Sequence, residues 1–172
     1  TLYDIDNIGT NLIAFVLKDS SGQIWIGTDK GLVQIVNKIP RFCNTGNQTY
    51  NYHSVVELKN RIYFFTRNNT IVVFDKSRSV FLPTISLPAW KNFKLNHTLA
   101  LNENDILITG KQTTLILDVT SSKITNARPF FNGEELSETY IHADNKNNAW
   151  VYNKTGNIWH YRQDIGLFKK YK

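Results

Sequence analysis

The sequence is poor in the features that mark several common protein classes. It has one cysteine, Cys43, in 172 residues, so no disulfide can form within the chain. A single cysteine fits a cytosolic protein and equally a bacterial periplasmic domain. No stretch approaches the roughly 18 apolar residues of a membrane-spanning helix. The chain also does not open on a charged and then apolar leader, so we expect any signal peptide to be absent or already removed.

Motifs of common enzyme active sites are also missing. The sequence contains no G-x-S-x-G, no H-E-x-x-H and no glycine-rich phosphate loop. Glu134, Glu135 and Glu138 lie close together, and a carboxylate pair serves glycosidases, but acidic loop residues are usually only solvated. We therefore expect a region without catalytic residues, cofactor or metal.

The basic residues of the chain are scattered. The net charge is +6 and the isoelectric point is about 9.4, but the longest basic run is only Lys169-Lys170. A nucleic-acid-binding surface usually carries a denser stripe of Lys and Arg. We expect no nucleic-acid partner and interpret the charge as a solvated surface, with an acidic ligand as the alternative.

A strand–turn–strand pattern, in contrast, occurs four times. Its central residues are Trp25, Tyr63, Leu107 and Trp150, which are 38, 44 and 43 residues apart. Around them, two short apolar runs flank a polar turn in IWIGTDKGLVQI, IYFFTRNNTIVVF, ILITGKQTTLILDV and AWVYNKTGNIWHY. A period of about 40–50 residues with several strands per repeat is typical of the blades of a β-propeller.

Each repeat divides into four short strands, a to d from the centre of the ring outward. Runs such as IYFF and TIVVF are apolar on both faces, as expected for a sheet between two others. We predict an all-β chain, a partial β-propeller of about four blades of four antiparallel strands, spanning roughly 11–43, 52–82, 96–127 and 138–171. Most propellers have more blades, so we expect a larger ring of six to eight blades. Exposed blade faces at the ends of an incomplete ring would favour self-association, such as a homodimer.

The first repeat resembles the two-component regulator propeller repeat. That repeat has an apolar strand, then Asp-x-x-Gly-x-Leu/Ile-Trp-Ile-Gly-Thr, two further residues and Gly-Leu. The matching residues are Asp19, Gly22, Ile24, Trp25, Ile26, Gly27, Thr28, Gly31 and Leu32. The fourth repeat keeps Asp144, Trp150 and Gly156, whereas the second and third have lost the tryptophan and the Asp-x-x-Gly turn. We assign structural roles to the motif residues, because tryptophan rings can fill the space between blades and glycines serve turns or close approaches.

The resemblance implies a function that composition and spacing do not. Such repeats are typical of the periplasmic sensor region of hybrid two-component histidine kinases in Bacteroides-type bacteria. The chain would then be a non-catalytic periplasmic part of an inner-membrane sensor kinase, which meets the membrane only through the full-length protein. It would respond to an oligosaccharide and regulate genes of glycan utilisation. The alternative is a propeller that binds another protein and no small ligand.

Ligand contacts are expected in loops, on the face that carries the b–c turns and the d–a connections. Aromatic rings there could stack on a sugar, and polar groups could bind its hydroxyls. The candidates are Trp90, Phe93, Tyr52, His53, His97, Arg67 and Phe130, with Lys111 and Lys154 among the other polar residues of the b–c turns. Packing within the loop is the alternative for each aromatic residue. Because His53 and His97 each precede their central residue by ten positions, they should begin equivalent strands; no third metal ligand accompanies them.

Overall fold

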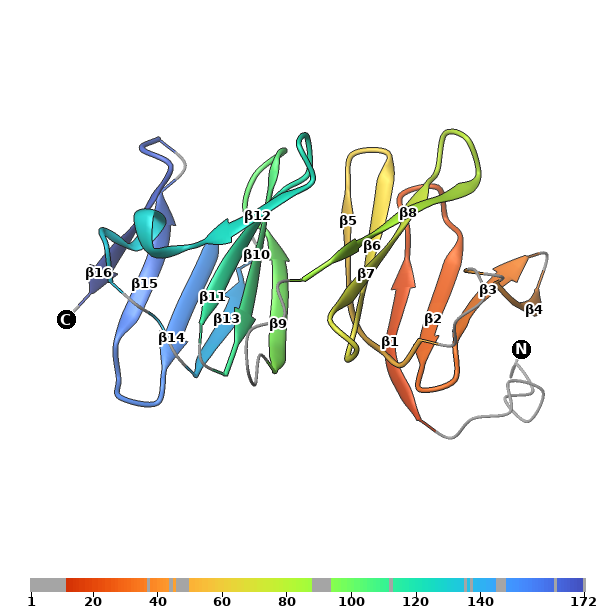
Figure 1. Ribbon diagram of the computed structural model, residues 1–172, viewed down its shortest axis with the longest axis horizontal. Coiled ribbons are helices and arrows are strands. Elements are labelled where there is room, and N and C mark those ends of the chain that lie inside the picture. The colour runs from red at the N-terminus through yellow and green to blue at the C-terminus, as the bar shows by residue number, and fades with distance from the viewer. Residues whose placement is uncertain are drawn as a thin grey trace. The chain divides into compact units, whose positions relative to one another are not determined.

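The computed structural model describes residues 12–36, 38–43, 45, 50–87, 94–111, 113–134, 136, 138–144, 148–162 and 164–171. This part of the chain is almost entirely β-structure, with one short 3-10 helix, η2 (Figure 1). The elements are β1 (Ile13–Lys18), β2 (Ile24–Thr28), β3 (Leu32–Val36), β4 (Ile39–Phe42), β5 (Tyr52–Leu58), β6 (Arg61–Thr66), β7 (Thr70–Asp75), β8 (Val80–Ser86), β9 (Leu95–Ala100), β10 (Asp105–Gly110), β11 (Thr114–Asp118), β12 (Lys123–Asn126), η2 (Arg128–Phe131), β13 (Thr139–Ala143), β14 (Ala149–Asn153), β15 (Ile158–Arg162) and β16 (Leu167–Tyr171).

The strands form four antiparallel sheets of four strands each. In every sheet the strands follow one another in chain order, as meanders joined by tight turns. The chain divides into two compact units, Thr1–Ser86 and Leu87–Lys172, with two sheets in each. The predicted all-β fold with four-stranded antiparallel sheets is confirmed. No helix in the described ranges is long and apolar enough to cross a membrane.

One strand is longer than the sequence suggests. We expected the second blade to end near residue 82, but β8 continues to Ser86, which pairs with Thr70. Pro83 lies where the register shifts, between the pairs Ile71–Ile85 and Val73–Leu82. Proline has no N–H to give to a ladder and is tolerated at a bulge of an edge strand, so β8 can pass through it.

The core of unit 1 lies between its two sheets and is aromatic. Trp25 of the first sheet is fully buried against Phe64 and Phe74 of the second, with ring centroids 5.4 and 4.8 Å away. This cluster extends to Phe15 of β1 and Tyr52 of β5. They lie where β1 and β2 of the first sheet contact β5 of the second. Packing between sheets thus centres on the tryptophan of the repeat.

The core of unit 2 has a different centre. Trp159 of β15 and Phe168 of β16 face the sheet β9–β12, and Phe131 of η2 stacks on Phe168 at 4.1 Å. The helix η2 contacts β16 and lies in the connection between the two sheets, which we expected to be a loop. In unit 2 an aromatic side chain of the connection therefore fills the space at the outer strands.

Candidate functional site

The motif aspartate of the first sheet organises the turn between β1 and β2. Asp19 Oδ1 accepts hydrogen bonds from the N–H groups of Ser21 and Gln23, both at 2.9 Å, and Oδ2 accepts one from the indole Nε1–H of Trp25 at 2.9 Å. Gly22, at φ +85°, supplies the left-handed residue that the turn needs. Burial raises the pKa of Asp19, but the hydrogen bonds outweigh burial and hold this pKa below its ordinary value.

Replacing Asp19 with Asn tests this arrangement. We expect Asp19→Asn to lower the free energy of unfolding at pH 7 by about 1–2 kcal/mol, because a buried charged acceptor is lost. Since the folded-state pKa lies below the unfolded one, the carboxylate stabilises the fold above about pH 4, and this contribution disappears as the pH falls through the folded pKa. Urea titrations from pH 7 to pH 3 should show a weaker acid dependence in the variant. An unchanged pH profile would mean that Asp19 is not linked to folding.

Other motif residues of the first repeat also have local contacts. Thr28 Oγ1 donates a hydrogen bond to the carbonyl of Gly31 at 2.8 Å and accepts one from Lys30 N–H at 3.1 Å, which ties the β2–β3 turn. Gly27 lies under the ring of Phe15, because a Cβ built on it would be 2.2 Å from a ring carbon. The absence of a side chain at this position lets Phe15 cover strand β2.

The aspartate–tryptophan pair recurs in the fourth sheet, but its ring lies elsewhere. Asp144 Oδ2 accepts a hydrogen bond from Trp150 Nε1–H at 3.3 Å, as in the first repeat. The Trp150 ring, however, is only partly buried and stacks on His160 of its own sheet, with centroids 4.2 Å apart. Within unit 2 the space between sheets is filled by Trp159, a role that we had given to Trp150. His160 pairs with Trp150 across the β14–β15 ladder, and Trp159 is the neighbour of His160 in β15. Because neighbouring residues of a strand point to opposite faces, Trp159 and Trp150 lie on opposite faces of the sheet.

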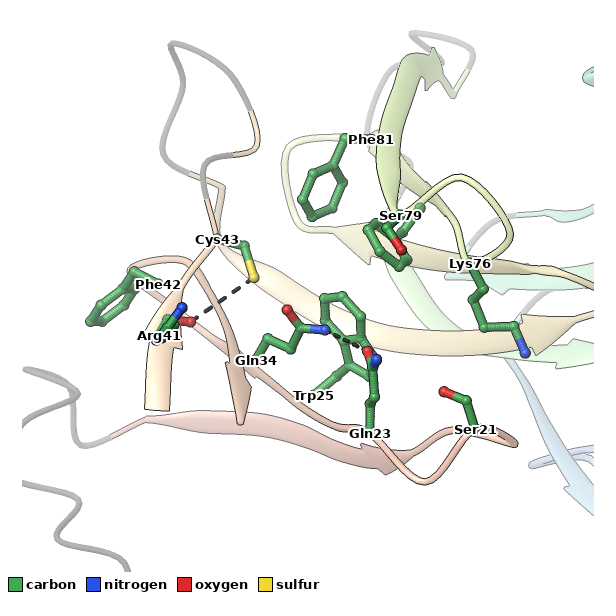
Figure 2. Close-up of a pocket in the computed structure, with 11 residues that line it drawn as sticks. Ser21, Gln23, Trp25, Gln34, Arg41, Phe42, Cys43, Lys76, Ser79 and Phe81 are labelled. Atoms are coloured by element: carbon green, nitrogen blue, oxygen red, sulfur yellow. Dashed lines mark hydrogen bonds between the residues drawn. The ribbon is translucent and has the colours of Figure 1, made fainter. Parts of the chain in front are cut away.

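A groove of about 510 Å³ opens in unit 1 between the outer strands of its two sheets (Figure 2). Aromatic residues of its lining include Trp25, Phe74 and Phe81, of which Trp25 is fully buried. Figure 2 shows Gln23 and Gln34 beside Trp25 on one side, with Ser79, Phe81 and Lys76 on the other. The remaining lining residues are Ser21, Arg41, Phe42 and Cys43. The groove thus joins flat apolar surface to amide, hydroxyl and cationic groups.

The charge in the groove is positive. Lys76 is held by an ion pair with Glu57 and donates a hydrogen bond to Ser20 Oγ at 2.7 Å, so part of its charge is balanced. Burial raises the pKa of Glu57, yet the hydrogen bonds from Lys76 and Ser20 outweigh it and the pKa is lowered. Arg41 is exposed and has no ion-pair partner among the described residues. Its guanidinium can therefore donate hydrogen bonds to a ligand.

Nothing in the lining of this groove suggests a nucleophile or a general acid–base pair. Cys43 is the one thiol of the chain, and burial raises its pKa to about 11, so it stays protonated at neutral pH. Among the described residues, the lining includes no aspartate, glutamate or histidine.

None of the described residues that were predicted to bind ligand lines this groove. Trp90 and Phe93 fall outside the described residues. Tyr52 begins β5 instead of lying in a loop; it is 1% exposed, packs edge-on against Phe64, and burial raises the pKa of its hydroxyl. Phe130 packs against the core of unit 2. For these two aromatic residues the structure favours packing, the alternative given above.

The polar candidates are more accessible. Arg67 is exposed in the turn after β6, and His53 lies half-buried in β5. In unit 2, His97 of β9 is exposed and its ring lies 5.7 Å from that of Tyr140. Tyr140 also lines a smaller pocket, of about 250 Å³, together with Lys111 and Lys154 of the b–c turns. The structure thus brings together, at one pocket, several polar residues of the predicted loop face.

Sequence reasoning missed the residues that line the groove in unit 1. Gln34 is the one polar residue in the otherwise apolar strand LVQIV, and Trp25 pairs directly with it across the β2–β3 ladder. Gln23 immediately precedes β2, and its side chain accepts a hydrogen bond from Gln34. Gln34 could have indicated the groove, because it is a polar residue on the same face of the sheet as Trp25. That face should be apolar wherever the neighbouring blade covers it.

The chain is similar to solved propeller structures. It matches the extracellular domain of the hybrid two component system BT3049 from B. thetaiotaomicron with a TM-score of 0.67 and 18% identity, over 94% of this chain and 22% of that one. The extracellular domain of the hybrid two component system BT4673 from the same organism gives a TM-score of 0.64 and 19% identity, over 92% and 21%. The WD40 β-propeller domain of Doa1 gives a TM-score of 0.62 and 10% identity, over 88% and 51%.

These similarities concern structure. No protein-family model and no curated protein matches the chain. It spans about a fifth of the length of the two B. thetaiotaomicron domains. At such identities the matches establish the fold alone, and that fold is a partial β-propeller.

Proposed function

We propose that this chain is a non-catalytic, ligand-sensing part of the periplasmic region of a hybrid two-component sensor histidine kinase. The ligand is an oligosaccharide, and its binding regulates genes of glycan utilisation. The proposal draws on the Asp19–Trp25 repeat motif and on the structural similarity to extracellular domains of hybrid two component systems. The observation that carries it in this chain is the groove of unit 1.

The chemistry of the groove suits a sugar. The faces of sugar rings carry C–H groups that pack on aromatic surface, here that of Phe81, while hydroxyls require fixed donors and acceptors. The amides of Gln23 and Gln34 offer both, and Arg41 offers a forked set of donors. A ligand bound across the groove would contact both sheets. It could shift a conformational equilibrium only if it bound one arrangement of the protein better than the other.

A specific observation also supports the alternative, a propeller that binds a protein. Tyr152, Ile158 and Tyr171 are each more than 40% exposed and lie side by side across β14, β15 and β16. Such an apolar surface can accept another protein or a second copy of this chain. Self-association through it would make the sedimentation coefficient depend on concentration.

The first test of the proposed function is binding to variants of the groove. Isothermal titration of the protein with a panel of neutral oligosaccharides should identify a ligand. We expect Gln34→Ala and Arg41→Ala each to weaken its binding about tenfold, the loss typical of one good hydrogen bond to a charged or well-oriented group. Arg67→Ala removes an exposed arginine outside the groove and should leave affinity unchanged. Equal affinity of all three variants and the parent would exclude the groove as the site.

A further inference from the structure

The smaller pocket, in unit 2, is cationic. Three lysines, Lys94, Lys111 and Lys154, line it together with a single carboxylate, that of Glu138. Glu138 pairs with Lys154, with 3.8 Å between Oε2 and Nζ. Lys94 and Lys111 have no ion-pair partner within the described ranges. Among the described residues, the pocket therefore holds positive charge that no ion pair balances.

Backbone hydrogen bonds fix the segments that carry these side chains. Lys111 N–H donates to the carbonyl of Lys94 at 2.9 Å, and Glu138 N–H donates to the carbonyl of Lys111 at 3.0 Å. These bonds join the start of β9, the end of β10 and the start of β13. Lys94 and Lys111 therefore lie close together because the strands place their backbones side by side, and Lys154 is linked to them by its ion pair with Glu138. All three lysine side chains are exposed.

Neutral groups complete the lining. Asn96 adds an amide, and the Tyr140 ring is stacked on Tyr152 with centroids 5.4 Å apart. Lysine ammonium groups gathered in one pocket repel one another, and a bound anion relieves that repulsion. The flat ring of Tyr140 offers an apolar surface beside the charge, as would suit a ring-shaped ligand better than a bare ion.

We propose that the pocket of Lys94, Lys111 and Lys154 is an anion-binding site that takes the carboxylate or sulfate group of an acidic sugar. The ammonium groups would donate charge-assisted hydrogen bonds to the anion, with Asn96 beside them. The sugar ring would lie on Tyr140. This site belongs to unit 2 and does not depend on the groove of unit 1.

Titration of the intact chain with three probes tests the site. We expect digalacturonate to bind and to shift the NMR signals of Asn96 and Lys111, and neutral digalactose to bind at least about tenfold more weakly. Raising the salt concentration should weaken the binding of digalacturonate, because the charges are exposed. Sodium sulfate, the third probe, distinguishes binding of a free anion from binding of an anionic sugar. Sulfate binding as tight as digalacturonate binding would overturn the role of the sugar, and no binding of either anion would overturn the site.

Variants give a sharper test. The double variant Lys111→Gln/Lys154→Gln should bind digalacturonate about fivefold more weakly, whereas Lys123→Gln, the same change at an exposed lysine of β12 outside the pocket, should have no effect. Glu138→Gln should strengthen binding about twofold, because it removes the carboxylate that competes for Lys154. If Glu138 had only a structural role, Glu138→Gln would not increase the affinity for digalacturonate.

Unchanged affinity in the double variant would overturn the proposal, provided that its thermal unfolding matches that of Lys123→Gln. Gln34→Ala serves to separate the two sites, since it changes only unit 1. If no neutral sugar binds the groove but digalacturonate binding still depends on Lys111 and Lys154, the anion site stands and the proposed function of the groove fails.

Discussion

Trp25→Ala should lower the free energy of unfolding by about 3–5 kcal/mol, the range for removing a large aromatic side chain from a core. The ring is fully buried between the two sheets of unit 1, against Phe64 and Phe74. Its removal leaves a cavity and also deprives Asp19 of the indole N–H that it binds. The cavity weakens the packing between the sheets, and the lost hydrogen bond weakens the turn between β1 and β2.

Trp150→Ala is a matched control, because this residue makes the same bond to an aspartate six positions earlier. Its ring lies against His160 and Tyr171 of its own sheet and is only partly buried. We expect a loss of about 1 kcal/mol. Urea denaturation of both variants, followed by far-UV circular dichroism, measures the difference. Equal losses would contradict the different packing of the two motif tryptophans.

Phe131→Ala should also lower the free energy of unfolding by about 3–5 kcal/mol, although Phe131 lies in a connection between sheets. The ring is 1% exposed, stacks on Phe168 at 4.1 Å and meets Trp159 edge-on at 6.0 Å. It fills the space between the outer strands of unit 2. The corresponding space between the outer strands of unit 1 is the groove. Loss of Phe131 therefore opens a cavity in the core.

Phe130→Ala changes the adjacent residue and serves as the control. Phe130 is partly buried beside the same core, so we expect a loss of about 1 kcal/mol. Thermal denaturation monitored by near-UV circular dichroism compares the two variants. If Phe130→Ala proved the more destabilising, the packing of η2 described here would be wrong.

The repeat made most of the fold predictable. Each of the four central residues, Trp25, Tyr63, Leu107 and Trp150, lies in the second strand of its sheet. The prediction worked because strand–turn–strand patterns are local: apolar runs and turn residues a few positions apart determine each hairpin. Antiparallel meanders then follow from the short connections.

Packing between sheets was less predictable. The bond between Asp19 and Trp25 spans six residues and belongs to the motif, but the position of the ring depends on the neighbouring sheet. Trp159 and Phe131 contact residues far away in sequence, so no local pattern distinguishes them from surface aromatics. The helix η2 is only four residues long and too short to show a helical period.

The candidate sites depended on the same long-range geometry. The groove of unit 1 gathers Gln23, Gln34, Arg41 and Phe81 from several strands of two sheets. Its size depends on the distance between the outer strands of the two sheets, and the sequence of a single strand does not predict that distance. The loop face, in contrast, was predictable in part, because Lys111 and Lys154 lie in turns that the repeat places on one side of the blades.

We propose that the groove of unit 1 binds an oligosaccharide without transforming it. The most direct test is an NMR titration of the protein with neutral oligosaccharides, observing the side-chain amides of Gln23 and Gln34 and the indole N–H of Trp25. We predict saturable shifts of these signals with one class of sugar, and no new sugar signals over time. Shifts confined to other parts of the chain, or breakdown of the sugar, would contradict the account.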